Sequence, residues 1–375
     1  MQKFKIKEIG EIVSGGTPST SNSSYWGGEI DWITPKDLSN NKNKYIINGE
    51  RTISLAGLNN SSAKIVPKNT VLLTSRAPIG YLALSGKEMC TNQGFKSIIC
   101  DKSIILPDYL YYLLSTKIND LIGISSGSTF LELSKSVLEN YEIYIHRLSE
   151  QQHIVDTIGS IDNLIEQSTE INSKLFIYGL VLLNKIYKKS LYIESKIINE
   201  VSILKDGTHN PPKRVKVGVP LLTGQNIENG FINHSNISYI TKNDYKKIHS
   251  KYAPMKNDLV ITKIGTLGKV GILREQDIPL AIHCNSALLR FNSITPSVGF
   301  FILNSQDFSD EFHSHKNQTV QEFINLEQIG NLKIKIPTSN YNEIFKIILD
   351  KISCNEEKIK KLFDIKNEYL KKFFG

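Results

Sequence analysis

The sequence contains no long uncharged apolar segment of the kind that crosses a membrane as a helix. The longest apolar run free of charge extends from Leu175 to Leu183, well short of the ~20 residues that span a bilayer. Residues 1–7 carry charge without a following apolar stretch, so no secretory signal is predicted. Apolar residues make up 40% of the chain and charged residues 22%, which is typical of a globular protein with a sizeable core. We therefore expect a cytoplasmic protein with no membrane contact.

Cysteine is scarce, and an excess of acidic residues is absent. Cys90, Cys100, Cys284 and Cys354 show no Cys-x-x-Cys spacing, which excludes a disulfide scaffold, argues against structural zinc and agrees with a reducing cytosol. Lysine and arginine outnumber aspartate and glutamate by 45 to 37, a formal net charge of +8. A surplus of this size is compatible with a polyanionic partner, although many basic proteins have none.

The chain repeats itself at a period of about 190 residues. The segment Pro67–Thr74, followed by Gly80, returns as Met255–Thr262, followed by Gly268, and each matching pair is 188 positions apart. Further matches before and after this block keep the same order, with offsets between 188 and 193. Collinear matches with small length differences between them are typical of a duplicated domain whose loops vary in length.

The residue pattern changes at the same place in each copy, from one typical of strands and turns to one typical of a helix. The first ~145 residues of each copy alternate short apolar runs with Gly, Asn, Ser and Pro clusters, which predicts strands and turns. Residues 107–114 predict a helix there, with Pro107 in its first turn. Each copy then closes with a proline-free helical pattern, expected over residues 149–188 and 341–373, and Ser149 is the expected N-cap of the first.

These two closing helices carry apolar residues at coiled-coil spacing. The stripe consists of Ile154, Ile158, Ile161 and Ile165 in the first helix and of Ile344, Ile348, Ile352, Ile359, Leu362 and Tyr369 in the second, with polar Asn355 near it. A single amphipathic helix cannot bury its own stripe, so we predict that the two helices pack antiparallel. At ~1.5 Å per residue each would be roughly 50 to 60 Å long. Gly159 and Gly179 weaken the first helix by about 1 kcal/mol each relative to alanine, which is compatible with a bend.

The predicted fold class is α+β, with two mixed α/β globules joined by two long antiparallel coiled-coil helices in a pseudo-twofold internal repeat. The globules are expected to occupy residues 1–147 and 191–338. The helices are expected within residues 148–190 and 339–375.

Two motifs resemble those of DNA-modifying enzymes but lack essential parts. Asn210-Pro211-Pro212 is similar to the motif that holds the target amine in DNA adenine methyltransferases, yet Lys213 replaces the aromatic ring on which a flipped base stacks. Pro107-Asp108 and Glu194-Ser195-Lys196 contain the carboxylates of a metal-dependent nuclease. These carboxylates lie 86 residues apart, on opposite sides of the first long helix, and Pro107 is already explained as a helix start.

Two further segments lack the pattern of a nucleotide or metal site. Gly265–Lys269 has the wrong glycine spacing for a phosphate loop, and Val270 stands where a magnesium-binding hydroxyl is needed. His313 and His315 have no recognisable third ligand nearby. The sequence therefore predicts a non-catalytic chain with no metal site and no cofactor of its own.

Polar loops recur at matched positions of the two copies and suit DNA binding. The candidates in the first copy are Ser14, Thr17, Thr34, Lys36, Asp37, Ser75, Arg76, Asn92, Gln93, Lys96, Ser128 and Thr129. Those in the second copy are Lys205, Thr208, His209, Lys213, Arg214, Gln225, Asn226, Lys263, Lys269, Asn285, Gln318 and Thr319. Hydroxyls and backbone NH groups suit phosphates, whereas Arg, Lys, Asn and Gln suit purine edges. A single loop of this kind is more often an ordinary turn, and a duplicated fold also repeats its turns, but matched recurrence favours binding.

The sequence resembles type I restriction–modification specificity subunits over essentially its whole length. The resemblance rests on Ser14–Ser19, Tyr25–Leu38, Val71–Gly80, Thr91–Phe95 and Leu148–Ile154, the last similar to the family's Leu-x-Glu-Gln-x-x-Ile signature. The second copy diverges more, because Asn342-Glu343-Ile344 matches only part of that signature, although Ile334–Pro337 is kept. The first copy has His146-Arg147 where the family has proline.

The resemblance implies two target recognition domains, each reading one half of a bipartite, asymmetric site in double-stranded DNA. It also implies that the long helices fix the spacer and dock methyltransferase (M) subunits, two being expected. The residues expected in docking are Glu150, Gln151, Ile154, Ile158, Ile161, Ile165, Ile344, Ile348, Ile352 and Leu362. Restriction (R) subunits are the other implied partner, and S-adenosylmethionine, ATP and Mg belong to the partner subunits. Globules at the ends of a ~50 Å rod would lie about 1.5 duplex turns apart.

Two other functions stay open. The chain could be an orphan scaffold of the same fold that binds methyltransferase subunits without DNA sequence preference, and the diverged polar loops of the second copy are the feature that discriminates it. A self-contained methyltransferase or nuclease is disfavoured by the missing motifs.

Overall fold

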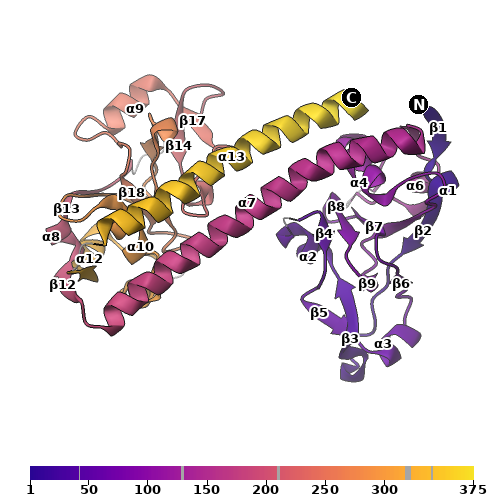
Figure 1. Cartoon of the computed structure of the whole chain (residues 1–375), viewed down its shortest axis with the longest axis horizontal. Helices are drawn as coiled ribbons and strands as arrows, with labels where there is room; N and C mark the ends of the chain where they lie inside the picture. The colour runs from indigo at the N-terminus through magenta and orange to yellow at the C-terminus, as the bar shows by residue number, and fades with distance from the viewer. Residues whose placement is uncertain (42, 128–130, 209–211, 317–321, 339–340) are drawn as a thin grey trace. The chain divides into compact units, whose positions relative to one another are not determined.

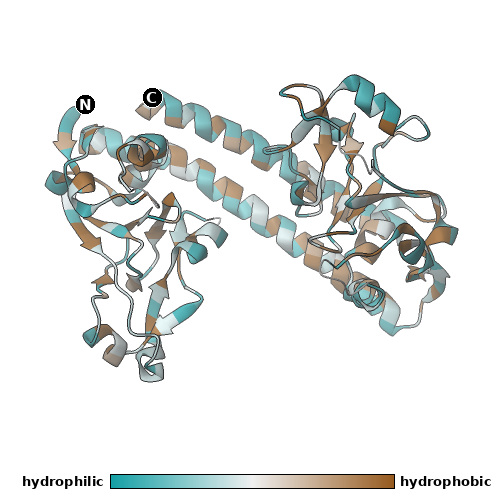
Figure 2. Ribbon diagram, turned by 180° about the vertical axis from the view of Figure 1, so that it is seen from behind, coloured by the Kyte–Doolittle hydropathy of each residue, from teal (hydrophilic) through white to brown (hydrophobic). Residues whose placement is uncertain are grey.

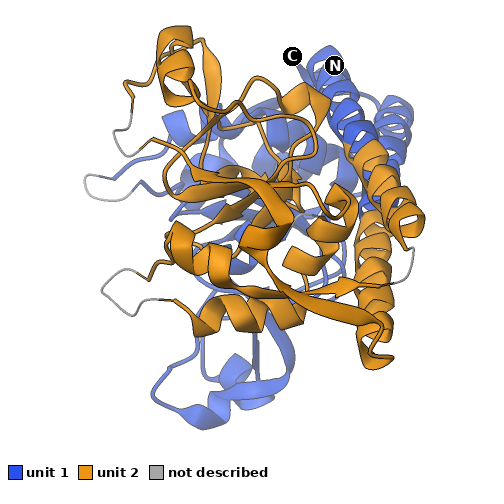
Figure 3. Ribbon diagram, turned by 90° about the vertical axis from the view of Figure 1, so that its left-hand side faces the viewer, with its two compact units in different colours: residues 1–169, 357–375 blue, residues 170–356 orange. Residues whose placement is uncertain are grey.

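The computed structural model describes residues 1–41, 43–127, 131–208, 212–316, 322–338 and 341–375. The chain forms two compact units, which Figure 3 colours separately. The first unit consists of residues 1–169 and 357–375, and the second of residues 170–356. Helices α7 (Leu148–Lys188) and α13 (Asn342–Phe374) are each divided between the two units, about one half belonging to each. No helix in the described part of the chain has both the length and the apolar character needed to cross a membrane.

The first unit contains a five-stranded sheet, a four-stranded sheet and a two-stranded pair (Figure 1). Its elements before α7 are β1 (Gln2–Lys5), α1 (Ile6–Ile9), β2 (Gly10–Ser14), the 3-10 helix η1 (Ser23–Tyr25), β3 (Trp26–Ile33), α2 (Pro35–Asn40), β4 (Tyr45–Ile46), β5 (Arg51–Ile53), α3 (Leu55–Asn59), β6 (Ile65–Val66), β7 (Val71–Ser75), β8 (Ile79–Ser85), β9 (Met89–Thr91), β10 (Lys96–Cys100), α4 (Pro107–Thr116), α5 (Ile118–Gly123), α6 (Lys135–Glu139) and β11 (Glu142–Ile145). The strand orders are β2-β10-β7-β8-β4, β5-β3-β9-β6 and β1-β11. The confirmed helix α4 begins at Pro107, as the sequence predicted.

The second unit repeats this plan with different strand lengths. Its elements between the long helices are β12 (Tyr192–Lys196), α8 (Ile197–Glu200), β13 (Val201–Asp206), β14 (Val219–Leu222), η2 (Gly224–Asn226), β15 (Ile227–Glu228), β16 (Phe231–Ile232), β17 (Ser238–Ile240), α9 (Lys242–Ile248), β18 (Leu259–Thr262), β19 (Val270–Ile272), η3 (Glu275–Asp277), β20 (Ala281–Ile282), β21 (Ser286–Phe291), α10 (Pro296–Leu303), α11 (Gln306–Ser314), α12 (Leu326–Asn331) and β22 (Lys333–Pro337). The strand orders are β13-β21-β18-β19, β17-β14-β20, β15-β16 and β12-β22.

The two units share one topology, which confirms the internal repeat. The antiparallel pair β12-β22 corresponds to β1-β11, and the order β13-β21-β18-β19 corresponds to β2-β10-β7-β8. The parallel pair β14-β20 likewise corresponds to β3-β9. The matched turns also agree in backbone conformation, since Asn69 and Asn257 both have positive φ, at 67° and 70°. Gly80 and Gly268 also both have positive φ, at 104° and 77°. Asparagine and glycine are the residues that adopt this conformation most readily.

Helices α7 and α13 run antiparallel in each unit. In the first unit, Lys366 donates a hydrogen bond to Asp162 at 2.6 Å. In the second unit, the amide of Asn172 donates to Glu356 at 2.8 Å. Teal and brown segments alternate along both helices in Figure 2, as the predicted apolar stripe requires. The N-cap prediction at Ser149 was wrong, because α7 begins at Leu148.

The two glycines of α7 lie where an aromatic side chain of each globule packs on the helix. A Cβ built on Gly179 would lie 2.3 Å from the ring of Phe301 in α10, whereas one on Gly159 would meet only the hydroxyl of Tyr112 in α4, at 3.8 Å. We call the contact region around Gly159 and Tyr112 the first seat, and that around Gly179 and Phe301 the second seat. The second seat is apolar, since the Phe301 ring lies 6.0 Å from Phe176 and 5.2 Å from Phe345, centroid to centroid.

The first seat is polar. The hydroxyl of Tyr112 donates to Asp162 at 2.7 Å, and the ammonium group of Lys366 binds the other oxygen of the same carboxylate. Lys44 lies 3.4 Å from that hydroxyl and forms a 2.8 Å ion pair with Asp108. Two cations and two carboxylates, all at least three-quarters buried, thus share one network. Burial is the main reason that the pKa of Tyr112 is raised, and Asp162 adds to it.

Candidate nucleic-acid interface

The structure brings the predicted polar loops of the first globule together. The hydroxyl of Thr17 donates a hydrogen bond to the side-chain oxygen of Gln93. A Cβ on Gly94 would lie 3.3 Å from Pro35 and 3.7 Å from Arg76, so two more loops meet at this glycine. The segments 14–17, 34–37, 74–76 and 91–96 therefore form one surface, although up to 82 residues separate them in the sequence.

Thr34, Lys36 and Asp37 of this surface have partners within the first globule. Thr34 caps α2 by accepting from the backbone NH of Asp37 at 3.3 Å, and its own hydroxyl donates to the Asp37 carboxylate at 2.6 Å. Asp37 also accepts from the NH of Glu50 at 2.8 Å. Lys36 is exposed and forms a 2.7 Å ion pair with Glu50, which raises the pKa of its ammonium group. Asp37 therefore shapes the loop, while Lys36 can exchange one anionic partner for another.

The first surface contains a cluster of cations around Lys96. The Lys96 ammonium group lies 3.7 Å from the Glu132 carboxylate, and its side chain is only 9% exposed, against 45% for Glu132. Burial lowers the pKa of Lys96, and the charges of Arg76 and Lys135 lower it further against the opposing pull of Glu132. Lys96 also faces Ser14 across the β2-β10 ladder. The hydroxyl of Ser75 is buried without a hydrogen-bond partner among the described residues.

The corresponding loops converge in the second globule. Thr208 forms a β-bridge with His283, and the backbone NH of Lys263 donates to the carbonyl of Asn285 at 2.8 Å. A Cβ on Gly224 would lie 2.9 Å from the Thr262 methyl group, which joins η2 to the end of β18. The loops before β15 and after β13, β18 and β20 thus meet as they do in the first globule.

The second surface repeats the Thr34–Asp37 arrangement of the first but differs in how its buried lysine is paired. Asn226 accepts from the hydroxyl of Thr223 at 2.8 Å and caps η2. Lys263 forms a 3.0 Å ion pair with Asp206, and the two side chains are only 8% and 15% exposed. The exposed predicted residues of this copy are Lys205, Lys213, Arg214, Gln225 and Lys269. Ser128, Thr129, His209, Gln318 and Thr319 lie outside the described residues.

Sequence reasoning missed Glu132, Lys135 and Asp206. Glu132 follows the polar loop at 126–129, but nothing in the sequence places it against Lys96. Asp206 lies beside the predicted Lys205 but was not itself a predicted site residue, and only the fold pairs it with Lys263. The described residues contain no group of three or more His, Cys, Asp and Glu side chains placed to hold a metal ion.

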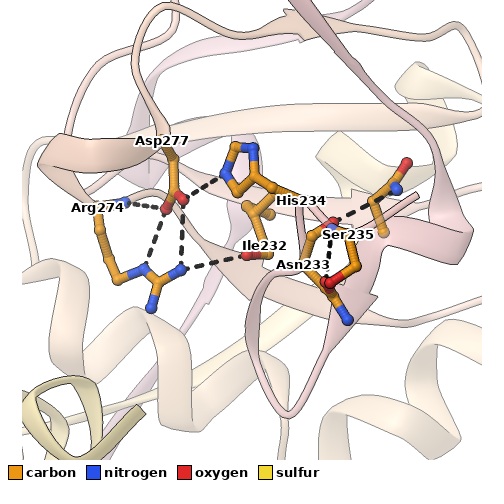
Figure 4. Close-up of polar contacts among 7 residues, drawn as sticks. Ile232, Asn233, His234, Ser235, Arg274 and Asp277 are labelled. Atoms are coloured by element: carbon orange, nitrogen blue, oxygen red, sulfur yellow. Dashed lines mark hydrogen bonds and ion pairs between the residues drawn. The ribbon is translucent and has the colours of Figure 1, made fainter. Parts of the chain in front are cut away.

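A second polar cluster surrounds the buried carboxylate of Asp277 (Figure 4). Asp277 accepts from the Arg274 guanidinium at 3.2 Å and lies 2.8 Å from His234 Nε2. Burial alone would raise the pKa of Asp277, but hydrogen bonds from His234 and Arg274 and the charge of Arg274 lower it overall. Arg274 also donates to the carbonyl of Ile232 at 3.2 Å. The cluster therefore fastens β16 to η3, a structural role.

The residues expected in partner docking divide between buried and exposed positions. Gln151 is fully buried, where its side chain accepts from the NH of Leu106 and donates to the carbonyls of Ile104 and His146. The buried isoleucines are Ile154, Ile158, Ile161, Ile348 and Ile352, whereas Ile165, Ile344 and Leu362 are half-buried and Glu150 is exposed. Buried side chains contact the chain's own core, so an approaching partner meets the outward faces of the helices instead. The exposed large apolar residues of the two long helices are Leu148, Leu164, Ile171, Ile177, Tyr178, Val181, Ile347, Phe363 and Ile365.

The fold defines a class: a duplicated α+β protein with two globules of matching topology, each with its own set of converging polar loops, and a pair of long helices. The family model described as the type I restriction modification DNA specificity domain matches residues 1–175 and 213–366. Because that match covers most of the sequence, the chain belongs to this family.

Individual relatives agree with the family assignment. The chain is 49% identical over 173 residues to the type I restriction enzyme MjaIX specificity subunit of Methanocaldococcus jannaschii, covering 46% of this chain and 40% of that protein. It is 27% identical over 299 residues to the MjaVIII specificity subunit of the same organism, covering 73% and 69%. The chain thus spans less than half the length of the first of these relatives.

A solved structure has the same fold. The S subunit of a type I restriction-modification system from M. genitalium superposes with a TM-score of 0.57 and 18% sequence identity, covering 100% of this chain and 96% of that one. The likeness extends over both globules and both long helices, so the whole α+β architecture predicted from the sequence is shared.

Proposed function

We propose that this chain is the DNA sequence-specificity subunit of a type I restriction–modification complex in the cytoplasm. Each globule reads one half of a bipartite, asymmetric site, and the helix pair fixes the spacer between the halves. The observation that carries this proposal is the convergence of matched polar loops into one surface on each globule. Two surfaces of equal topology and unequal side chains suit two different half-sites.

The chemistry of the loops supports contacts with both phosphates and bases. Hydroxyls such as that of Thr17, and cations such as Lys36 and Lys269, suit phosphate oxygens. Arg76 and the amides of Asn92 and Gln93 have the donor geometry that reads purine edges in the major groove. Since the phosphate contacts release counterions, we expect binding to weaken steeply with salt.

This chain recognises the DNA sequence, and its partner subunits carry out the catalysis. M subunits, two by the pseudo-twofold repeat, dock on the outward apolar residues of α7 and α13. S-adenosylmethionine, ATP and Mg act on the M and R subunits, and this chain holds no cofactor. The many large apolar side chains exposed on the two helices support this docking, because such side chains at this density mark interaction surfaces.

A selection experiment tests the proposal. The chain, assembled with its M subunit, is used to select duplexes from a random library by electrophoretic shift. The expected result is two short defined blocks around an undefined spacer. A single contiguous motif would refute the bipartite reading, and a complex that selects no motif would favour the orphan scaffold.

Single substitutions then assign each half-site. Arg76→Ala is expected to relax selection in one block only, while Lys213→Ala and Arg214→Ala act on the other block or mainly reduce the salt dependence. Lys36→Ala is expected to act with Arg76 on the first block, but more weakly, because Glu50 already neutralises Lys36. If Arg76→Ala and Arg214→Ala relax the same block, the assignment of one globule to one block is wrong.

A further inference from the structure

The two globules hold a buried lysine at different places in the same backbone framework. The NH of Ser75 donates to the Gly94 carbonyl, and the Ser75 carbonyl accepts from the NH of Leu133. Lys263 makes the same two backbone bonds, to Asn285 and from Ile324. Ser75 and Lys263 are therefore equivalent positions, as are Leu133 and Ile324.

The strand registers extend this equivalence to the charged side chains. Lys96 faces Ser14 across the β2-β10 ladder, and Ala287 faces Asp206 across the β13-β21 ladder. Lys96 is thus replaced by Ala287, and Ser14 by Asp206. Counting back one residue from Leu133 and Ile324, Glu132 is replaced by Phe323. The first globule carries Ser14, Ser75, Lys96 and Glu132 where the second carries Asp206, Lys263, Ala287 and Phe323.

The two lysines differ in how firmly their charge is neutralised. Lys263 and Asp206 lie 3.0 Å apart, and both side chains are largely buried, so this pair is closed to solvent. Lys96 and Glu132 are 3.7 Å apart, and Glu132 is 45% exposed on the outer side of the pair. Arg76 and Lys135 place two further positive charges near Lys96. The single carboxylate of Glu132, 3.7 Å away, balances these three charges incompletely.

We propose that Lys96 binds an acceptor atom of DNA in the first half-site, and that Glu132 occupies the acceptor's place until DNA displaces it. This inference rests on the proposed function and deepens it. The exposed carboxylate of Glu132 marks the direction from which an acceptor reaches the ammonium group. The acceptor is a phosphate oxygen or a purine atom such as guanine O6 or N7, both of which lysine binds. The second globule has no such exchange, because Asp206 holds Lys263 from within the sheet.

The test measures affinity for the selected duplex, using the full chain with its M subunit. Glu132→Gln removes the competing charge and keeps the shape, so we expect binding about three- to tenfold tighter, the range of one partly exposed ion pair. Glu142→Gln is the charge-matched control, since it also removes a carboxylate paired with a lysine of the same globule. Lys96→Met is expected to weaken binding about tenfold or more.

A double-mutant cycle separates exchange at Lys96 from general repulsion of DNA by Glu132. If Glu132 acts through Lys96, Glu132→Gln gives no gain in the Lys96→Met background. A gain that persists there, or a gain no larger than that of Glu142→Gln, overturns the inference. Glu132 is half exposed, so its variant folds even where Lys96→Met does not, and the comparison with Glu142→Gln then decides alone.

The source of the acceptor follows from the same titrations. Loss of a phosphate contact weakens all sequences alike and reduces the salt slope by about 1. Loss of a base contact instead relaxes selection at one position of the first block. A library that yields no motif at all contradicts the proposed function, whereas a motif unaffected by Lys96 and Glu132 contradicts only this inference.

Discussion

Replacing each glycine of α7 with alanine is expected to change stability in opposite directions. Alanine favours a helix by about 1 kcal/mol over glycine, so propensity alone predicts two stabilising changes. At Gly159 the added methyl group meets only the Tyr112 hydroxyl, at an ordinary contact distance of 3.8 Å. Gly159→Ala should therefore raise the free energy of unfolding by roughly 0.5–1 kcal/mol.

Gly179 is in a different situation. The added methyl group would lie 2.3, 2.6 and 2.8 Å from three carbons of the Phe301 ring, closer than real carbon atoms approach. Phe301 is fully buried and packed by Phe176 and Phe345, so the ring cannot move without disturbing the cluster. Overpacking of this kind costs about 1–3 kcal/mol, and the tight distances argue for the upper half of that range. After the helix gain is subtracted, Gly179→Ala should destabilise by about 1–2 kcal/mol.

Thermal and urea denaturation of the two variants beside the parent chain measure this contrast. In a unit of this size, a difference of about 2 kcal/mol separates the two Tm values by roughly 4–8 °C. Each glycine lies in a different unit, so far-UV and aromatic signals should be followed together to resolve separate transitions. If Gly179→Ala proves as stable as Gly159→Ala, the seat does not constrain Phe301 and the argument from packing fails.

Three further predictions concern buried polar groups. Burial lowers the pKa of His249 to about 4 from its usual 6.5. The unfolded chain therefore binds the proton first as the pH falls, and the free energy of unfolding should drop by up to about 3 kcal/mol between pH 7 and pH 4. In His249→Gln, the free energy of unfolding measured by urea denaturation should depend less on pH. Arg290→Met leaves the nearly buried Asp258 carboxylate without its 2.7 Å guanidinium partner and should cost about 3 kcal/mol, whereas a neutral result would mean that solvent reaches Asp258. Tyr112→Phe removes the hydrogen bond to Asp162 and should lower stability by about 1.5 kcal/mol, which a Tm equal to that of the parent chain would contradict.

The sequence was most informative where a pattern is long or repeated. Isoleucines at coiled-coil spacing predicted both long helices, and the 188-residue match predicted a duplicated fold, in which Asn69 and Asn257 share a positive φ. Local signals near element ends were less reliable. Ser149 resembles an N-cap, yet the helix begins at Leu148 with the Glu150 carboxylate accepting from the NH of Arg147 at 3.2 Å.

Roles that depend on distant partners could not be predicted. Gln151 belongs to a signature associated with partner docking, but in the fold its amide satisfies backbone groups of the first globule. Gly179 looked like a weak point of α7 until Phe301 was found against it. Glu132 belongs to no recognisable motif. Its ion pair with Lys96 forms because the next residue, Leu133, donates a backbone hydrogen bond to Ser75 at the end of β7. In each case the deciding neighbour lies at least 36 residues away in the sequence.

The unlike seats limit how such subunits can recombine. The first seat joins Tyr112 to side chains of both long helices, and the second surrounds Phe301 with phenylalanines. A chimera that set the second globule on the helix halves of the first would place Phe301 against Asp162 and Lys366, leaving a buried carboxylate short of a donor. Exchange of a globule is therefore better tolerated when the helix segments that contact it are exchanged with it, so the unit of exchange extends beyond the globule into both long helices.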